Sequence, residues 1–177
     1  MQNDEPFMYI EKQYKQKNYF LDQDTYSMAL DNLVIACVDI ALIYDDRMLI
    51  GKRLYHPLKD WYIVGGRLRA GEKPQIAASR HIFETLGLQI KDCDVQRYKY
   101  IMNFYGAWAK RAHPPSSNGT HTHSSVYAIR ISNQEMNSIK LLGEFMQVEW
   151  VNIYDVGQSD YHNLLKLIAN KLLTTRL

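Results

Sequence analysis

The sequence is poor in cysteine and has no cysteine spacing typical of a disulfide framework or a zinc site. Cys37 lies in an apolar run and Cys93 in a polar turn, and the 177 residues contain no other cysteine. Isolated cysteines of this kind favour free thiols in a reducing cytoplasm. A single disulfide between the two is the alternative.

The sequence also lacks a hydrophobic run that could cross a membrane. The longest apolar stretch, LVIACVDIALIY at 33–44, contains Asp39 and is shorter than the roughly 20 residues that a membrane helix needs. The first residues, MQNDEPF, are polar and acidic, so the basic and apolar regions of a signal peptide are missing. We therefore expect a cytoplasmic protein with no membrane partner.

An excess of charge of one sign is missing as well. The chain has 21 Lys and Arg against 19 Asp and Glu, which leaves a net charge of +2, and the basic residues are scattered. A nucleic-acid-binding domain usually concentrates its basic residues on one face. We therefore expect no nucleic-acid partner.

The sequence contains enough apolar residues, in regular patterns, to form the core of one domain. The first 20 residues are polar with scattered aromatic residues, so we interpret 1–20 as an N-terminal extension and 21–177 as the domain. The patterns predict, in chain order, a helix at 21–32, strands at 33–44, 47–54 and 61–64, a helix at 74–86, strands at 96–109 and 124–132 with a long loop at 110–123 between them, a strand at 147–153 and a helix at 160–173. This order predicts an α/β fold in which helices cover a mixed sheet.

The segment GGRLRAGEKPQIAASRHIFETLGL at 65–88 carries most of the chemical information. Pro74 and Gly87 are typical of the start and end of a helix. At about 100° per residue, one face of this helix is expected in the core, namely Ile76, Ala78, Ser79, Ile82, Phe83 and Leu86. The opposite face gathers polar groups, namely Arg80, His81, Glu84 and Thr85. Spacing alone also allows the simpler interpretation that this polar face is merely solvated.

The same segment resembles the Nudix box in every spacing. The box positions are occupied by Gly66, Glu72, Arg80, His81, Ile82, Glu84, Thr85, Gly87 and Leu88. The resemblance covers about 21–155 and implies a Nudix-type α/β/α sandwich with a mixed sheet. It also implies that Glu72 pairs with Arg80 and holds the loop of the box.

Two box positions depart from the family pattern, since His81 and Thr85 replace glutamates that are principal metal ligands in typical members. The resemblance implies a divalent cofactor, Mg²⁺ or Mn²⁺, and a hard cation of this kind needs a few protein oxygens besides substrate phosphates. We expect Glu84 and Glu144 to hold it. Carbonyl oxygens of the two glycines and a ring nitrogen complete the candidate metal ligands, which are Gly65, Gly66, Glu84, Glu144 and His81.

Within the family, the sequence resembles the GDP-mannose mannosyl hydrolase branch, which has a reduced box and forms dimers. By this resemblance Arg53 and Arg67 serve the diphosphate and Asp39 is a site carboxylate. The catalytic histidine of that branch corresponds to Phe145, so the general base is open. The candidates for that base are His121, His123 and Glu144. His113, beside two prolines, is expected on the surface of a loop.

Three functions remain open from the sequence. The first is a metal-assisted hydrolase that splits a nucleoside-diphosphate sugar, such as GDP-mannose, into nucleoside diphosphate and sugar. The second is an ordinary Nudix pyrophosphohydrolase that attacks phosphorus. The third is a catalytically inactive Nudix domain that binds a nucleotide or a protein partner.

Overall fold

The structure is a computed structural model that describes residues 6, 8–15 and 20–176, except for the side chains of 92 and 93. The expected thiol at Cys93 and much of the expected extension at 1–20 lie outside these described parts. Cys37 is a free cysteine, as expected. Over the described residues, no helix has both the length and the apolar character required to cross a membrane.

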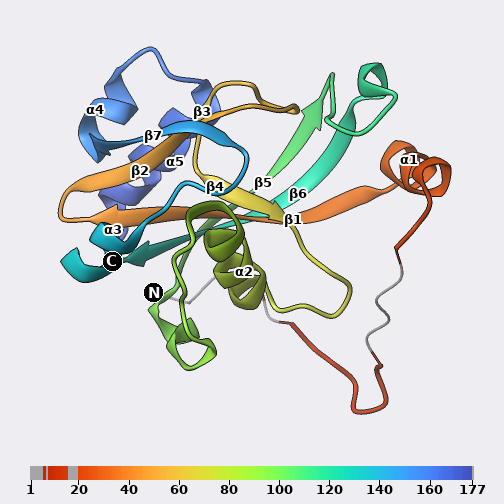
Figure 1. Ribbon diagram of the computed structural model, residues 1–177, viewed down its shortest axis with the longest axis horizontal. Coiled ribbons are helices and arrows are strands. Elements are labelled where there is room, and N and C mark those ends of the chain that lie inside the picture. The colour runs from red at the N-terminus through yellow and green to blue at the C-terminus, as the bar shows by residue number, and fades with distance from the viewer. Residues whose placement is uncertain (1–5, 7, 16–19, 177) are drawn as a thin grey trace.

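The strands of the described residues form one mixed sheet of seven (Figure 1). Their order is β3-β2-β1-β6-β5, with β4 paired to β1 and β7 paired to β2. Only β1 and β6 run parallel, whereas the other pairs are antiparallel. The strands are β1 Val34–Tyr44, β2 Arg47–Arg53, β3 Trp61–Tyr62, β4 Val64–Arg67, β5 Lys99–Trp108, β6 Thr120–Arg130 and β7 Phe145–Asn152.

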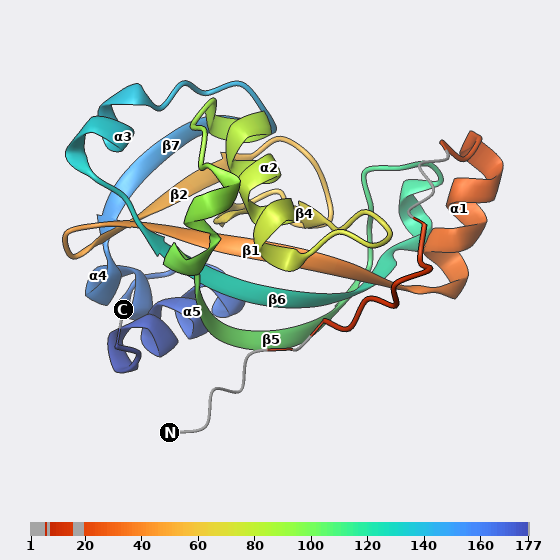
Figure 2. The ribbon, with the colours of Figure 1, turned by 90° about the horizontal axis from the view of Figure 1, so that it is seen from below.

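Helices cover both faces of the sheet, which confirms the expected α/β sandwich. Figure 2 shows α2 over one face and α5 over the opposite one. The α-helices are α1 Gln23–Asn32, α2 Pro74–Leu86, α3 Asn133–Ser138, α4 Ile153–Gln158 and α5 Asn163–Thr174. Two short 3₁₀ segments, η1 Asp92–Arg97 and η2 Ser116–Asn118, add turns between strands.

The core consists of two apolar clusters, one on each face of the sheet. Successive residues of a strand point to opposite faces. On β1, Val38 and Ile40 therefore pack in the cluster that contains Ile82 of α2, while Ala41 and Ile43 belong to the cluster of α5. This part of β1 is therefore apolar on both faces, one covered by α2 and the other by α5.

The segment after β2 differs from the single strand expected at 61–64. The structure has two short strands, β3 and β4, and Gly65 and Gly66 lie inside β4 rather than after a strand. Asp39 of β1 pairs with Gly65 in the ladder, and a side chain at Gly65 would collide with the Asp39 carboxylate. A side chain at Gly66 would collide with the His81 ring. The two glycines therefore permit close packing within the sheet.

The expected loop at 110–123 is shorter than predicted, because β6 begins at Thr120. The polar side chains of this part suggested a loop, but pairing with β1 and β5 makes it a strand. Tertiary pairing overrides local composition here. Helices α3 and α4, of six residues each, were not expected, since such short helices have little sequence periodicity.

The core face of α2 also differs from the expected one. Phe83 is 52 % exposed, whereas Ala77 and Thr85 are buried. Thr85 is buried because the segment 139–144 folds over the end of α2, where Leu142 N donates to Thr85 O at 2.9 Å, and Ala77 packs in the apolar cluster under the helix. Only the tertiary structure brings this segment to the helix.

The revised face of α2 predicts unequal effects of two neighbouring substitutions. Ile82→Ala removes a fully buried side chain, so we expect the free energy of unfolding to fall by about 2 to 5 kcal/mol. Phe83→Ala should cost less than about 1 kcal/mol, as at other exposed positions. Chemical denaturation of both variants measures the free energy of unfolding. Equal decreases in the two variants would mean that Phe83 packs in the core.

Candidate active site

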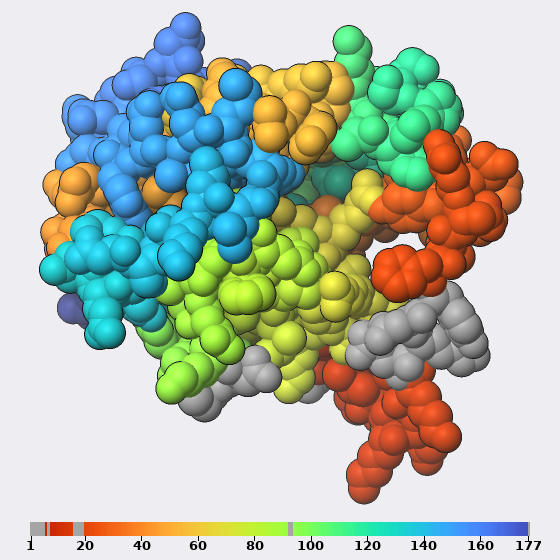
Figure 3. Space-filling view, viewed as in Figure 1, coloured from red at the N-terminus to blue at the C-terminus, as the bar shows by residue number. Residues whose placement is uncertain are grey.

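A cavity of about 660 Å³ lies where α2, the two glycines of β4 and the ends of β5 and β6 meet. The space-filling view shows the surface hollowed in this region (Figure 3). The residues predicted from the sequence that line it are Asp39, Arg53, Gly65, Gly66, Arg67, His81, Glu84 and Glu144. The fold thus gathers most of the candidate residues around one space.

The loop of the Nudix box is held by an ion pair next to this cavity. Arg80 Nε and Nη2 donate to the two Glu72 oxygens at 2.8 and 2.7 Å, and Nη2 also donates to Arg67 O at 3.0 Å. Burial alone would raise the pKa of Glu72, but hydrogen bonds from Arg80 and from the Arg69 backbone lower it below its usual value. Arg80 therefore fixes the chain on both sides of the loop.

His81 and Glu84 lie on the side of α2 that faces the cavity. His81 Nε2 lies 3.0 Å from Arg67 O, and because a carbonyl only accepts, Nε2 carries the proton. Burial lowers the pKa of His81, so the ring is neutral near pH 7. Glu84 is shared between Arg80 Nη1 at 3.2 Å and Arg69 Nη2 at 3.6 Å. Its negative charge is thus already neutralised by guanidinium groups.

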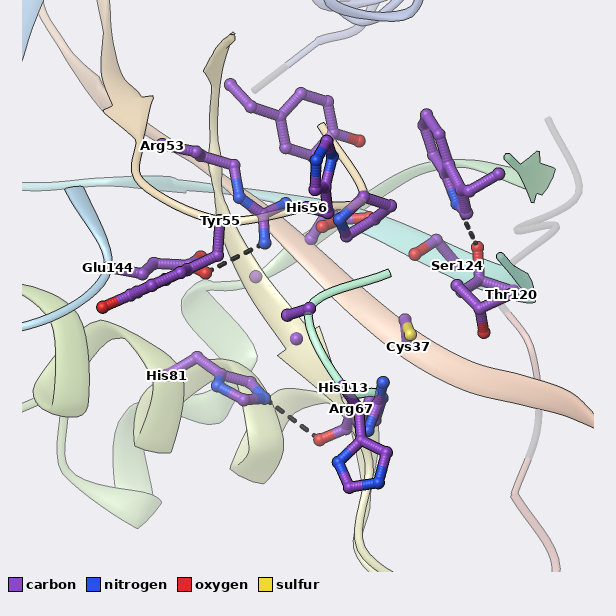
Figure 4. A pocket seen from close by; sticks show the side chains of 18 of the residues that line it. Cys37, Arg53, Tyr55, His56, Arg67, His81, His113, Thr120, Ser124 and Glu144 are labelled. Atoms are coloured by element: carbon purple, nitrogen blue, oxygen red, sulfur yellow. Dashed lines mark hydrogen bonds and ion pairs between the residues drawn. The ribbon is translucent and has the colours of Figure 1, made fainter. Parts of the chain in front are cut away.

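Glu144 reaches the cavity from the loop before β7 and is paired with Arg53. Arg53 Nη2 donates to Glu144 Oε2 at 2.9 Å, and this ion pair faces the cavity (Figure 4). An irregularity of the β2–β7 pairing lies between Lys52 and Arg53, at the point where Arg53 enters the site. Arg53 Nε is buried and has no hydrogen-bond partner among the described residues.

Asp39 is a buried carboxyl group in the wall of the cavity. Burial raises its pKa to about 6, against the opposing effects of a Ser124 hydrogen bond and the Arg53 charge. The Tyr62 hydroxyl acts in the same direction as Ser124, although no hydrogen bond of good geometry joins it to a partner. Cys37 also lines the cavity, but burial raises its pKa to about 12. Cys37 is therefore a thiol near pH 7 and not a nucleophile.

Arg67 is a cation without a carboxylate partner among the described side chains. Its guanidinium lies over the Tyr26 ring of α1, 5.0 Å from the centroid. Burial, followed by the nearby charge of Arg111, lowers its pKa, but an arginine stays charged at neutral pH. Arg67 is therefore free to meet an anionic ligand.

The wall around Arg67 comes from residues that the sequence did not indicate. His113 lines the cavity rather than the outer surface of its loop, and its ring packs edge-on against Tyr26 at 4.7 Å. Arg111 is buried and donates to Asp31 Oδ1 and Ser27 Oγ, both at 2.6 Å. These bonds tie α1 to the loop before β6. An arginine inside a Pro- and Ser-rich loop was the one local signal for this arrangement.

His121 and His123 lie on the opposite side of β6 from the cavity. The side chains of Thr120, Thr122 and Ser124 line the cavity, and alternation along the strand sends the two histidines to the other face. His123 stacks there on Tyr105 at 4.6 Å. The interpretation of these histidines as general bases is therefore wrong, because their rings face away from the candidate site.

Residues 35–170 match the family model of the NUDIX domain. The chain belongs to the Nudix family. A MutT NUDIX hydrolase from Burkholderia pseudomallei is similar in structure, with a TM-score of 0.63 and 19 % identity over 80 % of this chain and 99 % of that one. Two further structures, described below, are 14 and 18 % identical to this chain. At identities this low, each of the three likenesses concerns the fold alone. No curated protein sequence matches this chain.

Two further solved structures give the same architecture. The dihydroneopterin triphosphate pyrophosphohydrolase of E. coli has a TM-score of 0.57 and 14 % identity over 81 % of this chain and 99 % of that one. The NUDIX domain of Shewanella oneidensis NrtR, solved with ADP ribose, has a TM-score of 0.56 and 18 % identity over 86 % of this chain and 99 % of that one. The resemblance to the Nudix family is therefore confirmed by sequence and fold.

Nudix hydrolases generally use divalent metals such as Mg²⁺ or Mn²⁺, but the donor groups of this Nudix site do not fit such an ion. Over the described residues, His, Cys, Asp and Glu side chains form no group of three that could hold one. Glu84 and Glu144 are each paired with arginine, and the accessible nitrogen of His81 is a softer donor than Mg²⁺ prefers. The expected ligands thus line one cavity, but no three acidic, histidine or cysteine side chains of the described residues form a group that could hold a metal ion.

This mismatch predicts that Glu84 contributes little to metal binding by the free protein. We expect Mn²⁺ to bind only weakly, with a dissociation constant unchanged within about threefold in Glu84→Gln, because the arginines already satisfy that carboxylate. Titration followed by electron paramagnetic resonance measures the free ion. Tight binding that Glu84→Gln or Glu144→Gln abolishes would restore the metal centre expected from the sequence.

The raised pKa of Asp39 predicts a pH-dependent cost to stability. The folded protein retains this proton between pH 3.8, the ordinary pKa, and about 6. The contribution of the protonated Asp39 carboxyl group to the free energy of unfolding is therefore complete below the ordinary pKa, and it is lost as the pH rises through 6. Relative to the wild type, Asp39→Asn should gain about 2 to 3 kcal/mol in free energy of unfolding between pH 4 and pH 7.

Denaturant unfolding at a series of pH values measures this gain. Glu149→Gln, at an exposed position, is the matched control for the removal of one carboxylate. A constant difference for Asp39→Asn would show that the carboxyl group is ionised at its ordinary pKa.

Proposed function

We propose that this Nudix protein hydrolyses a nucleoside-diphosphate sugar, with water attacking the sugar carbon C1. The observation that supports the proposal is that the buried Asp39, with a pKa of about 6, lines the same cavity as Arg53 and Arg67. A volume of about 660 Å³ lies within the range of small-molecule sites, roughly 300 to 1,000 Å³. GDP-mannose is the first substrate to test.

The diphosphate would lie between Arg67 and Arg53. Arg67 has no carboxylate to satisfy it among the described residues, and Arg53 keeps a buried Nε without a partner. Guanidinium groups bind phosphate oxygens through two parallel hydrogen bonds. Two such groups supply the charge stabilisation that a departing nucleoside diphosphate needs.

Asp39 would be the general base. Its carboxylate would take a proton from water as the water oxygen bonds to C1, while the bond between C1 and the phosphate oxygen breaks and the diphosphate leaves with the electron pair. A general base is most effective when its pKa lies near the working pH. The Ser124 hydroxyl, which favours the ionised form of Asp39, would assist by stabilising the carboxylate.

A second candidate function is binding without hydrolysis. It is favoured by the pairing of Glu84 and Glu144 with arginines and by His81 and Thr85 at box positions that are glutamate in typical members. The NUDIX domain of NrtR in complex with ADP ribose is a structural precedent for occupation of this fold by a nucleotide derivative. Ligand binding without turnover separates this function from the first.

Incubation of the purified protein with a panel of nucleoside-diphosphate sugars tests the proposal. With and without Mg²⁺ or Mn²⁺, we expect nucleoside diphosphate and free sugar, because C1 is attacked. Nucleoside monophosphate with sugar phosphate would indicate attack on phosphorus and overturn the proposal. A rise in melting temperature without any product would favour the binding function.

The proposed base gives a sharper form of this prediction. Asp39→Asn should lower kcat by about 100-fold or more, while the dissociation constant of the nucleoside diphosphate changes little. In the wild type, kcat/KM should rise with pH through about 6, as the Asp39 carboxyl ionises. Glu149→Gln should leave both quantities unchanged, and full activity of Asp39→Asn would exclude Asp39 as the base.

A further inference from the structure

Three hydroxyl groups of β6 face the cavity in one row, from Thr120 through Thr122 to Ser124. Alternate residues of a strand are about 6.5 Å apart. Ser124 pairs with Cys37 of β1, and Cys37 pairs with Arg67 of β4, so Ser124 is level with the proposed diphosphate site. The row therefore leads from that site toward the other end of the cavity.

The hydroxyls of Thr122 and Ser124 already interact with neighbouring protein groups. Trp108 Nε1 donates to Thr122 Oγ1 at 3.1 Å, and the Thr122 hydroxyl donates to Gly106 O at 3.4 Å. The Ser124 hydroxyl is close enough to Asp39 to lower the pKa of that carboxyl group. Thr122 thus positions the Trp108 ring, and Ser124 acts on Asp39.

Thr120 differs from both. The residue is 9 % exposed, and its Oγ1 is buried without a hydrogen-bond partner among the described residues. A buried hydroxyl without a partner costs free energy, so such a group in a native cavity calls for an explanation. A ligand hydroxyl that pairs with Oγ1 would remove this cost.

The indole ring of Trp108 provides an apolar surface beside Thr120. The two residues are directly opposite each other in the β5–β6 ladder, and both line the cavity. The ring lies on Gly106, where a side chain would meet the indole at 2.6 Å, and His162 lies on another side at 6.4 Å. Together with the bond to Thr122, these contacts fix the ring in one orientation.

We propose that Thr120 and Trp108 form a subsite for a hydroxylated sugar ring of the ligand. The C–H groups of the ring pack on the indole, and a ring hydroxyl exchanges a hydrogen bond with Thr120 Oγ1. Figure 4 shows Thr120 and Ser124 on the side of the pocket away from Arg53 and Glu144. The assignment rests on the proposed function for the diphosphate, and it applies to a ribose or to a hexose.

The test uses Thr120→Val, which keeps the shape of the side chain and removes its hydroxyl. Because that hydroxyl has no partner in the ligand-free protein, the melting temperature should rise by about 2 to 4 °C. Affinity for a bound nucleoside-diphosphate sugar should fall by about three- to tenfold. Thr120→Ser retains a hydroxyl and should restore most of the affinity.

Thr122→Val is the matched control, since it removes the acceptor of the Trp108 N–H. We expect this variant to have a lower melting temperature than the wild type, the opposite of Thr120→Val. A lower melting temperature of Thr120→Val would show that its hydroxyl has a structural partner and would overturn the subsite. Unchanged affinity of Thr120→Val for every ligand would do the same.

Four ligands, measured by calorimetry, distinguish the two sources of the sugar ring: GDP-mannose, GDP, 2′-deoxy-GDP and inorganic diphosphate. If the ring is the hexose, Thr120→Val weakens the binding of GDP-mannose but not the binding of GDP. If the ring is the ribose, Thr120→Val weakens the binding of GDP more than that of 2′-deoxy-GDP, or it weakens the binding of GDP and GDP-mannose equally. In either case the binding of inorganic diphosphate is unaffected. Equal weakening of inorganic diphosphate would overturn the proposal.

Failure of the proposed function is separable from failure of this subsite. If nucleotide sugars bind in a Thr120-dependent manner but are not hydrolysed, the subsite stands and the hydrolase proposal fails. If they are hydrolysed equally well, with the same KM, by the wild type and Thr120→Val, the hydrolase proposal stands and the subsite fails.

Discussion

The site depends on the guanidinium group of Arg80. This one group bonds to both oxygens of Glu72, to Arg67 O and to Glu84. It thereby joins α2 to both ends of the loop at 67–73 and fixes the backbone from which Arg67 enters the cavity. Such charge-assisted, bidentate hydrogen bonds are stronger and more directional than neutral ones, so a short helix can hold an otherwise irregular loop in one conformation.

The distribution of charge follows from this arrangement. Glu84 and Glu144, the carboxylates that could have held a cation, are paired with arginines, and Arg67 is left to meet an anion. Asp39 is the exception, because burial keeps its pKa near 6. The cavity thus combines the guanidinium group of Arg67, unpaired among the described side chains, and the ion pair of Arg53 with Glu144 with one acid that can exchange a proton near neutral pH.

The sequence predicted α2 and β1 well, because Pro74 and Gly87 mark the helix ends and a long β-branched run marks the strand. It failed where the neighbours of a segment are distant in the chain. Thr120 to His123 read as loop, yet they form a strand that pairs with β1 and β5. The same error hid the alternation that places Thr120 and Thr122 in the cavity and turns His121 and His123 away. Thr85 and Phe83 were misassigned because the segment 139–144 covers α2 only in the folded chain.

The sequence by itself determined the family, the position of the box helix and the set of charged residues available to the site, since these depend on spacing along the chain. Only the tertiary structure decided which of these charges are neutralised and which face the cavity. The pairings of Arg53 with Glu144, 91 residues apart, and of Arg111 with Asp31, 80 residues apart, have no local signal. The pKa of Asp39 is likewise a property of burial, and burial exists only once the sheet and its helices have packed.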